Sequence, residues 1–368
     1  MRVLAAPDAT QSAILPQLEA TERLLARGAS LASGRDEDAE IVVMPDLGLP
    51  HNVRRIRGGF FTGAYYRWSG DTPFIPVDAT VNVCGVGLYR VSLPDEDDTV
   101  FRERVGKAMV TADGVTTYVP NFASGNHFVL LVDVAAGQQG LDPGRYLVLH
   151  ASSAEFKKQF NGLYPAPNNW YSDQVRTIEG EGHRYLRYIS GSTAETFARR
   201  AAMLVDYQRD RMRTFADLIA GPGGVEDEIL SVPHYGMPDR NSIAIGCQWM
   251  DPARPNYVLL TRPKAPVYLV RAREGGQNAV TTEQGERLLT PHGLGVKSTS
   301  PLTLSYGENS IEVNGKPFTL DASLAEEDLV AIRDFHGQET VQSTLAHTPG
   351  DILAELTQIA AYHRNGEK

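Results

Sequence analysis

Cysteine is scarce in this chain of 368 residues, since only Cys84 and Cys247 occur. Two cysteines cannot build the network of several disulfides that stabilises small secreted domains. Neither belongs to a C-x-x-C pair, which argues against a structural zinc knuckle. Free thiols persist in a reducing compartment, so the cysteine usage predicts a cytoplasmic protein.

Long hydrophobic runs are missing as well. No stretch of about 18 apolar residues occurs, so we expect no transmembrane helix and no membrane partner. Residues 1–25 show no charged head followed by a long apolar core, which argues against a secretory signal.

Positive charge is in short supply, since the formal net charge is −10 at pH 7. Proteins that bind nucleic-acid backbones usually carry a basic face, so we expect no DNA partner. Two local basic clusters nevertheless stand out. One consists of Arg54, Arg55 and Arg57, and the other of Arg199, Arg200, Arg209, Arg211 and Arg213. A solvated helix face explains the second cluster equally well.

Apolar residues make up 42% of the chain, which is ample for a core. Short apolar and β-branched runs predict strands at 40–45, ending at Asp46, and at 127–134 and 145–150. Residues 75–90 predict one or two strands around a tight Gly85-Val86-Gly87 turn. The region of about 240–320 is predicted to be rich in strands.

Two segments predict helices. Residues 194–219 have helical apolar spacing, with a capping box from Ser192 to Glu195 and Gly221 after the end. Residues 350–363 predict a closing helix. Strands outnumber helices without regular alternation, and we find no repeat or linker. The pattern therefore predicts a single α+β domain over residues 1–368.

Four of the nine histidines lie beside predicted strand ends or glycines. They are His127 in SGNHF, His150 in YLVLHASS, His234 in SVPHYG and His292 in TPHGLG. A lone histidine in such a place is more often a hydrogen-bonded core residue than a ligand. Four of them favour a site for Zn, Mn or a similar ion. Cys84 adds a soft ligand, although a free cysteine is more often a small buried apolar residue.

His292 is followed by Gly293 and Gly295, and glycine allows the backbone to approach a ligand closely. A histidine held there can act as a nucleophile or a general base. The alternative is a plain turn with an exposed histidine.

Six segments stand in a fixed order along the chain: VVMPD (42–46), IPVDATVNVCGVG (75–87), SGNHF (124–128), LHASS (149–153), PHY (233–235) and PHGLG (291–295). Their order and rough spacing resemble the RtcB family of RNA ligases, whose members carry MPD, GSGNHF and SHGAGR segments. The C-terminal TPGDI…AYHRNG is similar to the end of that family. The resemblance covers nearly the whole chain, and SGNHF is its most specific piece.

The resemblance implies an α+β, RtcB-like fold with central mixed or antiparallel sheets, flanking helices and an active site in a cleft. It also implies a reaction. A histidine attacks the α-phosphate of GTP, and the GMP passes to an RNA 3′-phosphate. An RNA 5′-hydroxyl then displaces GMP and joins the two ends. Mn²⁺, held by cysteine, aspartate and histidine ligands, supports these steps.

Carried over by position, the resemblance implies that His292 is the nucleophile and that Asp46 lies near it. The implied ligands for Mn²⁺ (or Zn²⁺) are Asn82, Cys84, His127, His150 and His234. Asn126 is expected to contact a phosphate or the surroundings of the metal. Lys264 and Arg364 are the remaining candidates for binding GTP.

Several positions depart from the family pattern. A match without gaps puts Asn82 in place of the ligand aspartate and Gly85 in place of the ligand cysteine. Cys84 then lies one residue early, which on a strand turns its side chain to the other face unless a bulge intervenes. Leu130, Tyr235 and Val296 replace a glutamate, an asparagine and an arginine.

These departures keep two other hypotheses open. One is a metalloenzyme of altered chemistry that uses another nucleotide or a small phosphorylated molecule. The other is a binding protein without ligase activity. The expected partners are therefore RNA ends or a phosphorylated small molecule.

Overall fold

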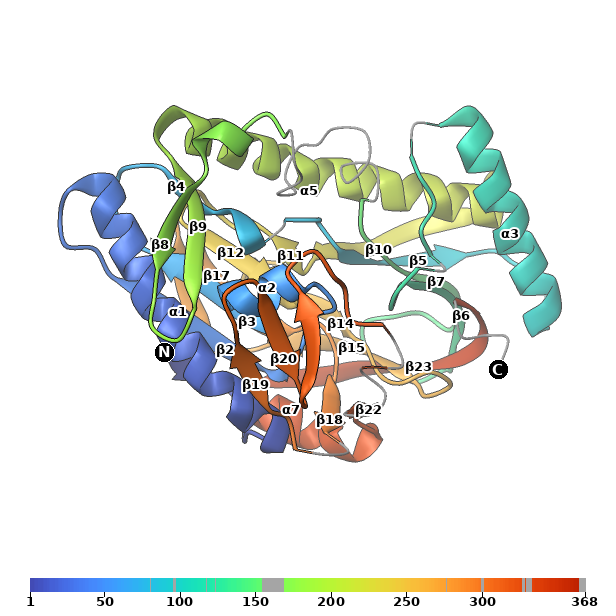
Figure 1. Ribbon diagram of the computed structural model, residues 1–368. Helices are drawn as coiled ribbons and strands as arrows, with labels where there is room; N and C mark the ends of the chain where they lie inside the picture. The colour runs from blue at the N-terminus through green and yellow to red at the C-terminus, as the bar shows by residue number, and fades with distance from the viewer. Residues whose placement is uncertain are drawn as a thin grey trace.

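The computed structural model describes residues 1–79, 81–94, 97–116, 118–122, 124–153, 169–275, 277–298, 301–325, 328 and 333–363. These residues form a mixed α+β structure with several sheets and few helices (Figure 1), which confirms the predicted class. Across them, no helix combines the length and the apolar character that crossing a membrane requires.

The largest sheet has seven antiparallel strands. In spatial order they are β10 (Val225–Pro233), β5 (Gly85–Val91), β7 (Gly144–Ala151), β6 (Phe128–Val134), β23 (Gly350–His363), β15 (Val267–Ala272) and β14 (Asn256–Leu259). Both faces are buried, since Leu130 and Val132 pack in one apolar cluster while Val129 and Leu131 pack in another. Burial on both faces explains the near-continuous apolar sequence of β6. The strands predicted at 127–134 and 145–150 are confirmed.

A five-stranded sheet forms the second large unit. Its order is β1 (Arg2–Val3), β2 (Ala39–Gly48), β3 (Thr62–Trp68), β12 (Ser242–Ile245) and β11 (Tyr235–Gly236). Helix α1 (Ala9–Ser33) packs on it and begins with a capping box between Asp8 and Gln11. β2 extends past Asp46, where we predicted the strand to end, but its pairing with β3 is interrupted between Val43 and Gly48.

The other strands form small sheets. They are β13 (Cys247–Met250), β17 (Gly285–Pro291) and β16 (Ala279–Thr282); β18 (Val296–Ser298) and β22 (Arg333–Phe335); β19 (Leu304–Tyr306), β20 (Ser310–Val313) and β21 (Lys316–Thr319); and β4 (Phe74–Pro76), β9 (Tyr185–Ser190) and β8 (Arg176–Glu179). They confirm the strand-rich character predicted for about 240–320.

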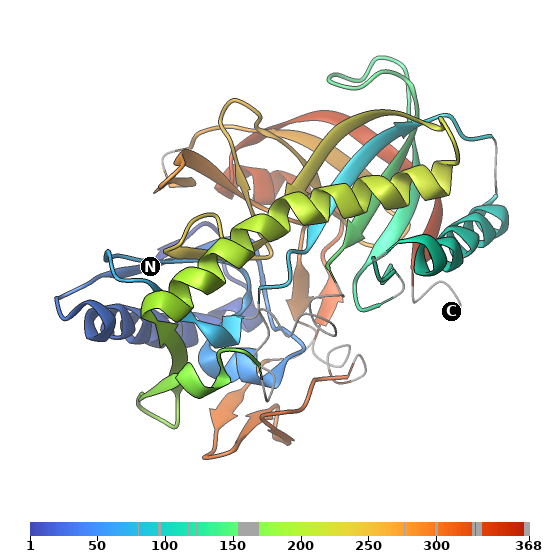
Figure 2. The same ribbon diagram turned by 90° about the horizontal axis from the view of Figure 1, so that it is seen from above.

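The other helices cover these sheets. They are α2 (Val53–Gly58), α3 (Asp98–Val115), α5 (Gly191–Ala220) and α7 (Val341–His347), with short 3₁₀ turns η1 (Val77–Ala79), η2 (Ser172–Gln174) and η3 (Gln338–Thr340). Figure 2 shows α5 running across both large sheets. Its buried residues Met212 and Phe215 pack with α3 on the seven-stranded sheet, while Phe197 and Ala201 pack in the cluster of the five-stranded sheet.

The chain crosses between sheets at the points that build the site. His234 lies between β10 of the seven-stranded sheet and β11 of the five-stranded sheet. Gly246 lies between β12 and β13, where the chain enters the sheet of β13, β17 and β16. Cys247 pairs with Pro291 at the end of β17, so His292 emerges beside the same crossing.

The predicted closing helix at 350–363 is wrong, because these residues form strand β23. Alanine, leucine, glutamate and glutamine favour a helix locally. β23 lies instead between β6 and β15, and there it buries Leu353, Ala354 and Leu356. Cross-strand packing in the middle of a sheet outweighs the local preference.

Two smaller predictions are also wrong. Gly85-Val86-Gly87 is not a turn but the start of β5, where Gly85 approaches β10 so closely that a Cβ atom would lie 2.9 Å from the Val232 carbonyl oxygen. α5 begins at Gly191, before the predicted capping box, so Ser192 is not its N-cap. Gly221 does follow the end of this helix.

Candidate metal centre and nucleophile

The side chain of Cys84 points into a cluster of histidines. Its sulfur lies 3.3 Å from Nε2 of His150 and 3.5 Å from Nε2 of His127. Residue 84 precedes β5, so the alternation of side chains along a strand does not apply to it. Val83 has φ of 52°, an unusual backbone conformation for a β-branched residue. The Asn82 side-chain oxygen also accepts a hydrogen bond from the Cys84 backbone N–H at 3.1 Å.

Sheet register brings His127 and His150 together. His150 on β7 pairs with Phe128 on β6, the residue that follows His127. Each ring is oriented by a backbone carbonyl: Nδ1 of His150 lies 3.1 Å from the Asn126 oxygen, and Nδ1 of His127 lies 3.2 Å from the Asn121 oxygen. Because Nδ1 must carry the proton in these bonds, Nε2 keeps its electron pair in both rings.

His234 completes the cluster from the crossing between the two large sheets. Its Nε2 lies 3.3 Å from Nε2 of His150. Its backbone N–H donates to the Cys84 carbonyl at 2.9 Å, which fixes the two segments against each other. The ligand atoms of Cys84, His150 and His234 all lie within 4.8 Å of one another, and all three residues are buried.

The donor set fits a transition-metal ion. A sulfur and imidazole nitrogens are ligands that Zn²⁺ and related ions accept. Around an ion with Zn-like bond lengths, tetrahedral ligand atoms lie roughly 3.3–3.6 Å apart. The contacts of 3.3 and 3.5 Å among these residues agree with that spacing. Cys84, His150 and His234 can therefore hold a metal ion, with His127 adjacent to them.

Burial controls the protonation of these groups. It lowers the pKa of His127 to about 4. It also lowers the pKa of His150 and His234 well below the usual value, and the neighbouring histidines lower the pKa of these two rings further. It also raises the pKa of the Cys84 thiol to about 12. At neutral pH the three imidazoles are uncharged and ready to ligate, whereas the thiol must lose its proton to a metal.

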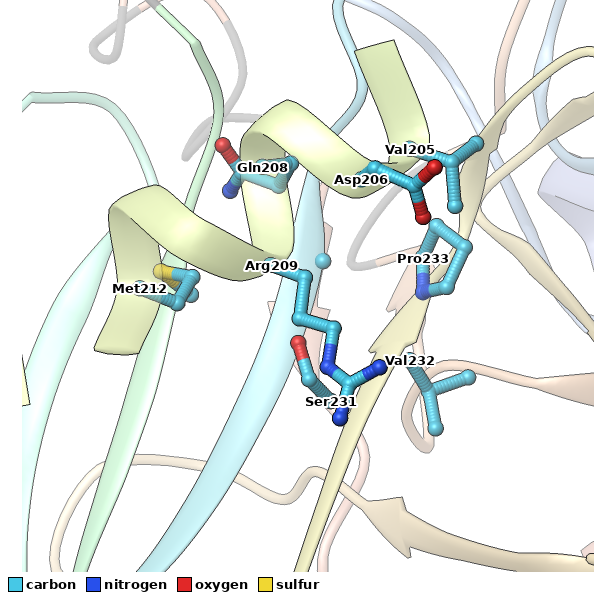
Figure 3. A pocket seen from close by; sticks show the side chains of 9 residues that line it. Val205, Asp206, Gln208, Arg209, Met212, Ser231, Val232 and Pro233 are labelled. Carbon is cyan, nitrogen blue, oxygen red and sulfur yellow. The ribbon is translucent and has the colours of Figure 1, made fainter. Parts of the chain in front are cut away.

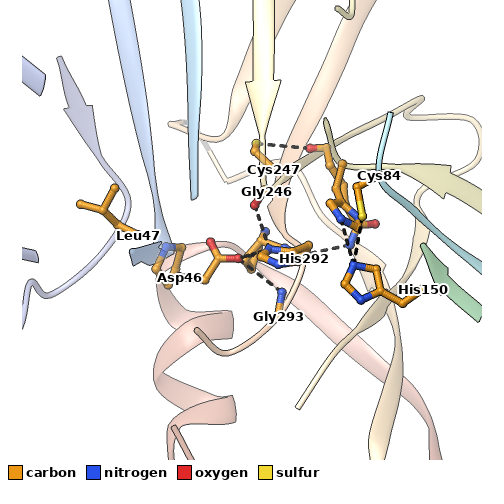
Figure 4. Close-up of polar contacts among 12 residues, drawn as sticks. Asp46, Leu47, Cys84, His150, Gly246, Cys247, His292 and Gly293 are labelled. Atoms are coloured by element: carbon orange, nitrogen blue, oxygen red, sulfur yellow. Dashed lines mark hydrogen bonds and ion pairs between the residues drawn. The ribbon is translucent and has the colours of Figure 1, made fainter. Parts of the chain in front are cut away.

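His292 lies beside this cluster and is held in a different way (Figure 4). Its ring centre is 4.7 Å from that of His234. Nδ1 of His292 lies 2.5 Å from a carboxylate oxygen of Asp46 and 3.0 Å from the Gly246 carbonyl oxygen. The backbone N–H of His292 donates to the same Asp46 oxygen at 3.2 Å. Asp46 thus lies next to His292, as the resemblance implied.

The environment of His292 gives the ring a proton on Nδ1. Burial alone would lower the pKa of His292, but the charge and hydrogen bond of Asp46 outweigh it, so the pKa is raised. Nε2 is then the nitrogen that can attack or transfer a proton. Gly295, with φ of 75°, makes room for this pair, because a Cβ atom there would lie 2.7 Å from the Asp46 Cα.

Asn82 and Asp78 do not supply the acid ligand that the resemblance implied. Asn82 was predicted to be a metal ligand, but its side-chain oxygen binds the Cys84 backbone instead. Asp78 is the nearest preceding acid in the sequence, and its fully buried carboxylate forms an ion pair with Arg187. Neither residue therefore supplies the carboxylate that the resemblance implied.

Among the described contacts, the remaining candidates place no side chain in the cluster. The Asn126 side chain is exposed, and only its backbone carbonyl serves the site. Lys264 is an exposed residue of the turn between β14 and β15, and its backbone N–H donates to Gln358. Leu130 is buried in the core of the seven-stranded sheet. Arg364 lies outside the described residues.

A cavity of about 160 Å³ lies between α5 and β10 (Figure 3). Its lining includes Gly85 and Pro233, which flank the ligands Cys84 and His234 along the chain. Arg209 and Glu228 form an ion pair there with nitrogen and oxygen 2.9 Å apart. The cavity thus adjoins the backbone that carries two of the ligands.

Three contributors to the site were missed in the sequence: the carbonyls of Asn121 and Gly246 and the left-handed backbone at Val83. Backbone carbonyls carry no side-chain signal, so sequence reasoning had no means to find them. The glycine at 246 was a weak sequence signal of an unusual backbone position. The structure explains why glycine is needed there: its φ is 63°, and a Cβ atom would lie 2.5 Å from the Thr62 side chain.

The chain was also compared with known proteins. No protein-family model matches it, and no curated protein matches its sequence.

Proposed function

We propose that this protein is a divergent relative of the RtcB RNA ligases and catalyses metal-dependent nucleotidyl transfer through His292. One observation carries the proposal: Asp46 holds Nδ1 of His292 at 2.5 Å while the ring stands 4.7 Å from His234 of the metal group. The proposed nucleophile, the acid that orients it and the candidate metal ligands are thus adjacent.

In the proposed reaction, Nε2 of His292 attacks the α-phosphorus of GTP. A bond between nitrogen and phosphorus forms, the bond to the β-phosphate oxygen breaks, and pyrophosphate leaves. Asp46 keeps the Nδ1 proton in place and stabilises the positive charge that develops on the ring. A bound Mn²⁺ or Zn²⁺ would neutralise phosphate charge.

The GMP group is then transferred from His292 to an RNA 3′-phosphate. An oxygen of that phosphate attacks the phosphorus, and the bond to His292 breaks. An RNA 5′-hydroxyl next attacks the former 3′-phosphate, which joins the ends and releases GMP. These two steps rest on the resemblance, and the RNA ends are the proposed substrates.

The lost acid ligand favours a second candidate function. Asp78 is paired with Arg187 and Asn82 binds the Cys84 backbone, so the metal group includes no carboxylate from the part of the chain that the structure describes. A changed metal centre favours transfer from another nucleotide or to a small phosphorylated molecule. The chemistry at His292 is the same in both functions.

Intact-mass measurement after incubation with each nucleoside triphosphate and with Mn²⁺ or Zn²⁺ tests both. We expect a mass increase equal to one nucleoside monophosphate, and the nucleotide that produces it separates the two functions. His292→Ala should remove the adduct, whereas His347→Ala, which changes a half-buried histidine at the end of α7, should keep it. An adduct that persists in His292→Ala, or no adduct with any nucleotide on metal-loaded protein, contradicts the proposal.

A further inference from the structure

Three arginines, two from α2 and one from the residue before β9, lie where these segments approach the sheet of β19, β20 and β21. They are Arg55, Arg57 and Arg184, which we call the arginine cluster. The side-chain nitrogen Nη1 of Arg57 donates to the Gly307 carbonyl at 2.7 Å. The Arg184 guanidinium lies 5.1 Å from the ring centre of Tyr306, the residue before Gly307. The Arg55 guanidinium lies 5.1 Å from the ring centre of Tyr235, the residue after His234, so the cluster adjoins the metal group without including any of its three residues.

The charges of the three arginines also act on two neighbouring tyrosines. Burial raises the pKa of Tyr66, and Arg55 and Arg184 oppose that rise. Burial also raises the pKa of Tyr306, and Arg184 and Arg57 oppose it. The three positive charges therefore act on the same small region.

Arg184 donates from Nη1 to the Gln17 side chain and from Nη2 to the Thr21 hydroxyl at 2.7 Å, but the other buried donors of the cluster are short of acceptors. Nε and Nη2 of Arg55 and Nε of Arg57 and Arg184 are buried and have no hydrogen-bond partner. The hydroxyls of Tyr185 and Tyr306 are buried there without a partner too. Arg57 is 4% exposed and Arg184 is 5% exposed, so these cations are almost fully removed from solvent.

The charge of the cluster is also uncompensated. Within the described ranges, no carboxylate lies within ion-pairing distance of any of the three arginines, whereas the neighbouring Arg54 pairs with Asp321. Buried cations without an anion are costly, and water satisfies hydrogen bonds without neutralising charge. Guanidinium groups match the oxygens of phosphate in pairs.

We propose that the arginine cluster binds a phosphate-type oxyanion, either free phosphate or the phosphate group of a monoester. Arg55, Arg57 and Arg184 would supply the charge, and the hydroxyls of Tyr185 and Tyr306 would donate hydrogen bonds. Of the three arginines, Arg55 is the least buried. This site is separate from the function proposed for His292 and does not depend on it.

Arg55→Met tests the site because its buried nitrogens make no hydrogen bonds that the variant would lose. Arg54→Met is the matched control, since it removes a neighbouring cation that is already paired. The melting temperature of the full chain is measured in increasing inorganic phosphate against sodium chloride of equal ionic strength. A nucleoside monophosphate is the second probe.

We expect phosphate to raise the melting temperature of the wild type and of Arg54→Met. In Arg55→Met the apparent affinity should fall roughly 10–100-fold, as for the loss of charge-assisted hydrogen bonds. Without phosphate, Arg55→Met should be as stable as the wild type or more stable, since an unpaired charge is removed. Stabilisation by phosphate alone identifies the free anion, and stabilisation by both probes identifies a monoester.

Two results would overturn the proposal. One is a melting temperature that responds to neither probe beyond the salt control. The other is an equal response in Arg55→Met and the wild type. Nucleotide labelling of His292 is measured separately, so failure of this site and failure of the proposed function are distinguished.

Discussion

His150 and His292 have ring centres only 6.3 Å apart, yet the groups that orient the two rings differ in charge. A neutral backbone carbonyl holds Nδ1 of His150, whereas the Asp46 carboxylate holds Nδ1 of His292. The pKa of His150 is lowered by burial and by neighbouring histidines, while Asp46 reverses the effect of burial on His292. One arrangement favours a neutral ligand and the other a basic nucleophile.

The two histidines also differ in how the fold positions them. Register across β6 and β7 places His150, so its location follows from the pairing of the seven-stranded sheet. His292 depends on a meeting of β2, β12, β13 and β17, where Asp46 belongs to β2 and Gly246 lies between β12 and β13. Metal binding and nucleophilic attack can therefore be disrupted separately.

The largest effect is expected from Cys84→Ala, which removes the sulfur that lies 3.3 Å from His150. Loss of a partner that merely supports a ligand costs about 10–100-fold in metal affinity, so loss of the ligand itself should cost more than about 100-fold. Metal content after dialysis measures this. Cys247→Ala is the matched control, because Cys247 is equally buried but outside the metal group. Equal metal loss in both variants would exclude Cys84 as a specific ligand.

Metal binding should also depend on pH through Cys84. Burial raises the pKa of this thiol to about 12, so metal binding near neutral pH must release its proton. Burial lowers the pKa of His127 to about 4, so this ring is already neutral near pH 7 and need not lose a proton from Nε2. We expect affinity to rise about tenfold per pH unit between about pH 6 and 8. Isothermal titration in buffers of different ionisation enthalpy measures the released proton, and a flat pH profile would contradict this.

Asp46→Asn should separate the two halves of the site. The amide keeps the size of the side chain but removes the charge that raises the pKa of His292. We expect the rate of labelling at saturating metal to fall about 10²–10⁴-fold, as when an orienting carboxylate beside a catalytic histidine is lost. Metal content should stay at the wild-type level. A loss of metal equal to that of Cys84→Ala would mean that the two histidine environments are not independent.

Sequence reasoning found the residues of the site better than their arrangement. The side chains of Asp46, Cys84, His150, His234 and His292 carry chemistry that a sequence displays, and the structure brings them together. Their contacts depend on backbone geometry, such as the left-handed Val83 and the carbonyl of Gly246. A residue sequence gives little sign of either.

In the fold, too, some elements were predicted from the sequence and others were not. Apolar runs predicted β6 and β7 correctly because burial on both faces leaves a direct trace in composition. β23 was predicted as a helix, because its place between β6 and β15 is fixed by pairing with residues far away in the sequence. The same local composition is therefore compatible with two structures, and only tertiary pairing decides between them.

The smallest effect is expected from Asn121→Ala, which acts on the metal side through a backbone carbonyl. Asn121 holds its segment by donating to the Ser152 carbonyl at 2.9 Å and accepting from Arg211 at 3.1 Å. Its own carbonyl orients His127, which is adjacent to the group of three ligands rather than part of it. Loosening the backbone segment at Asn121 should lower metal affinity by less than about tenfold. Loss of a partner that directly supports a metal ligand costs at least about that much. Competition with a chelator measures the change, and a loss as large as that of Cys84→Ala would place His127 among the principal ligands.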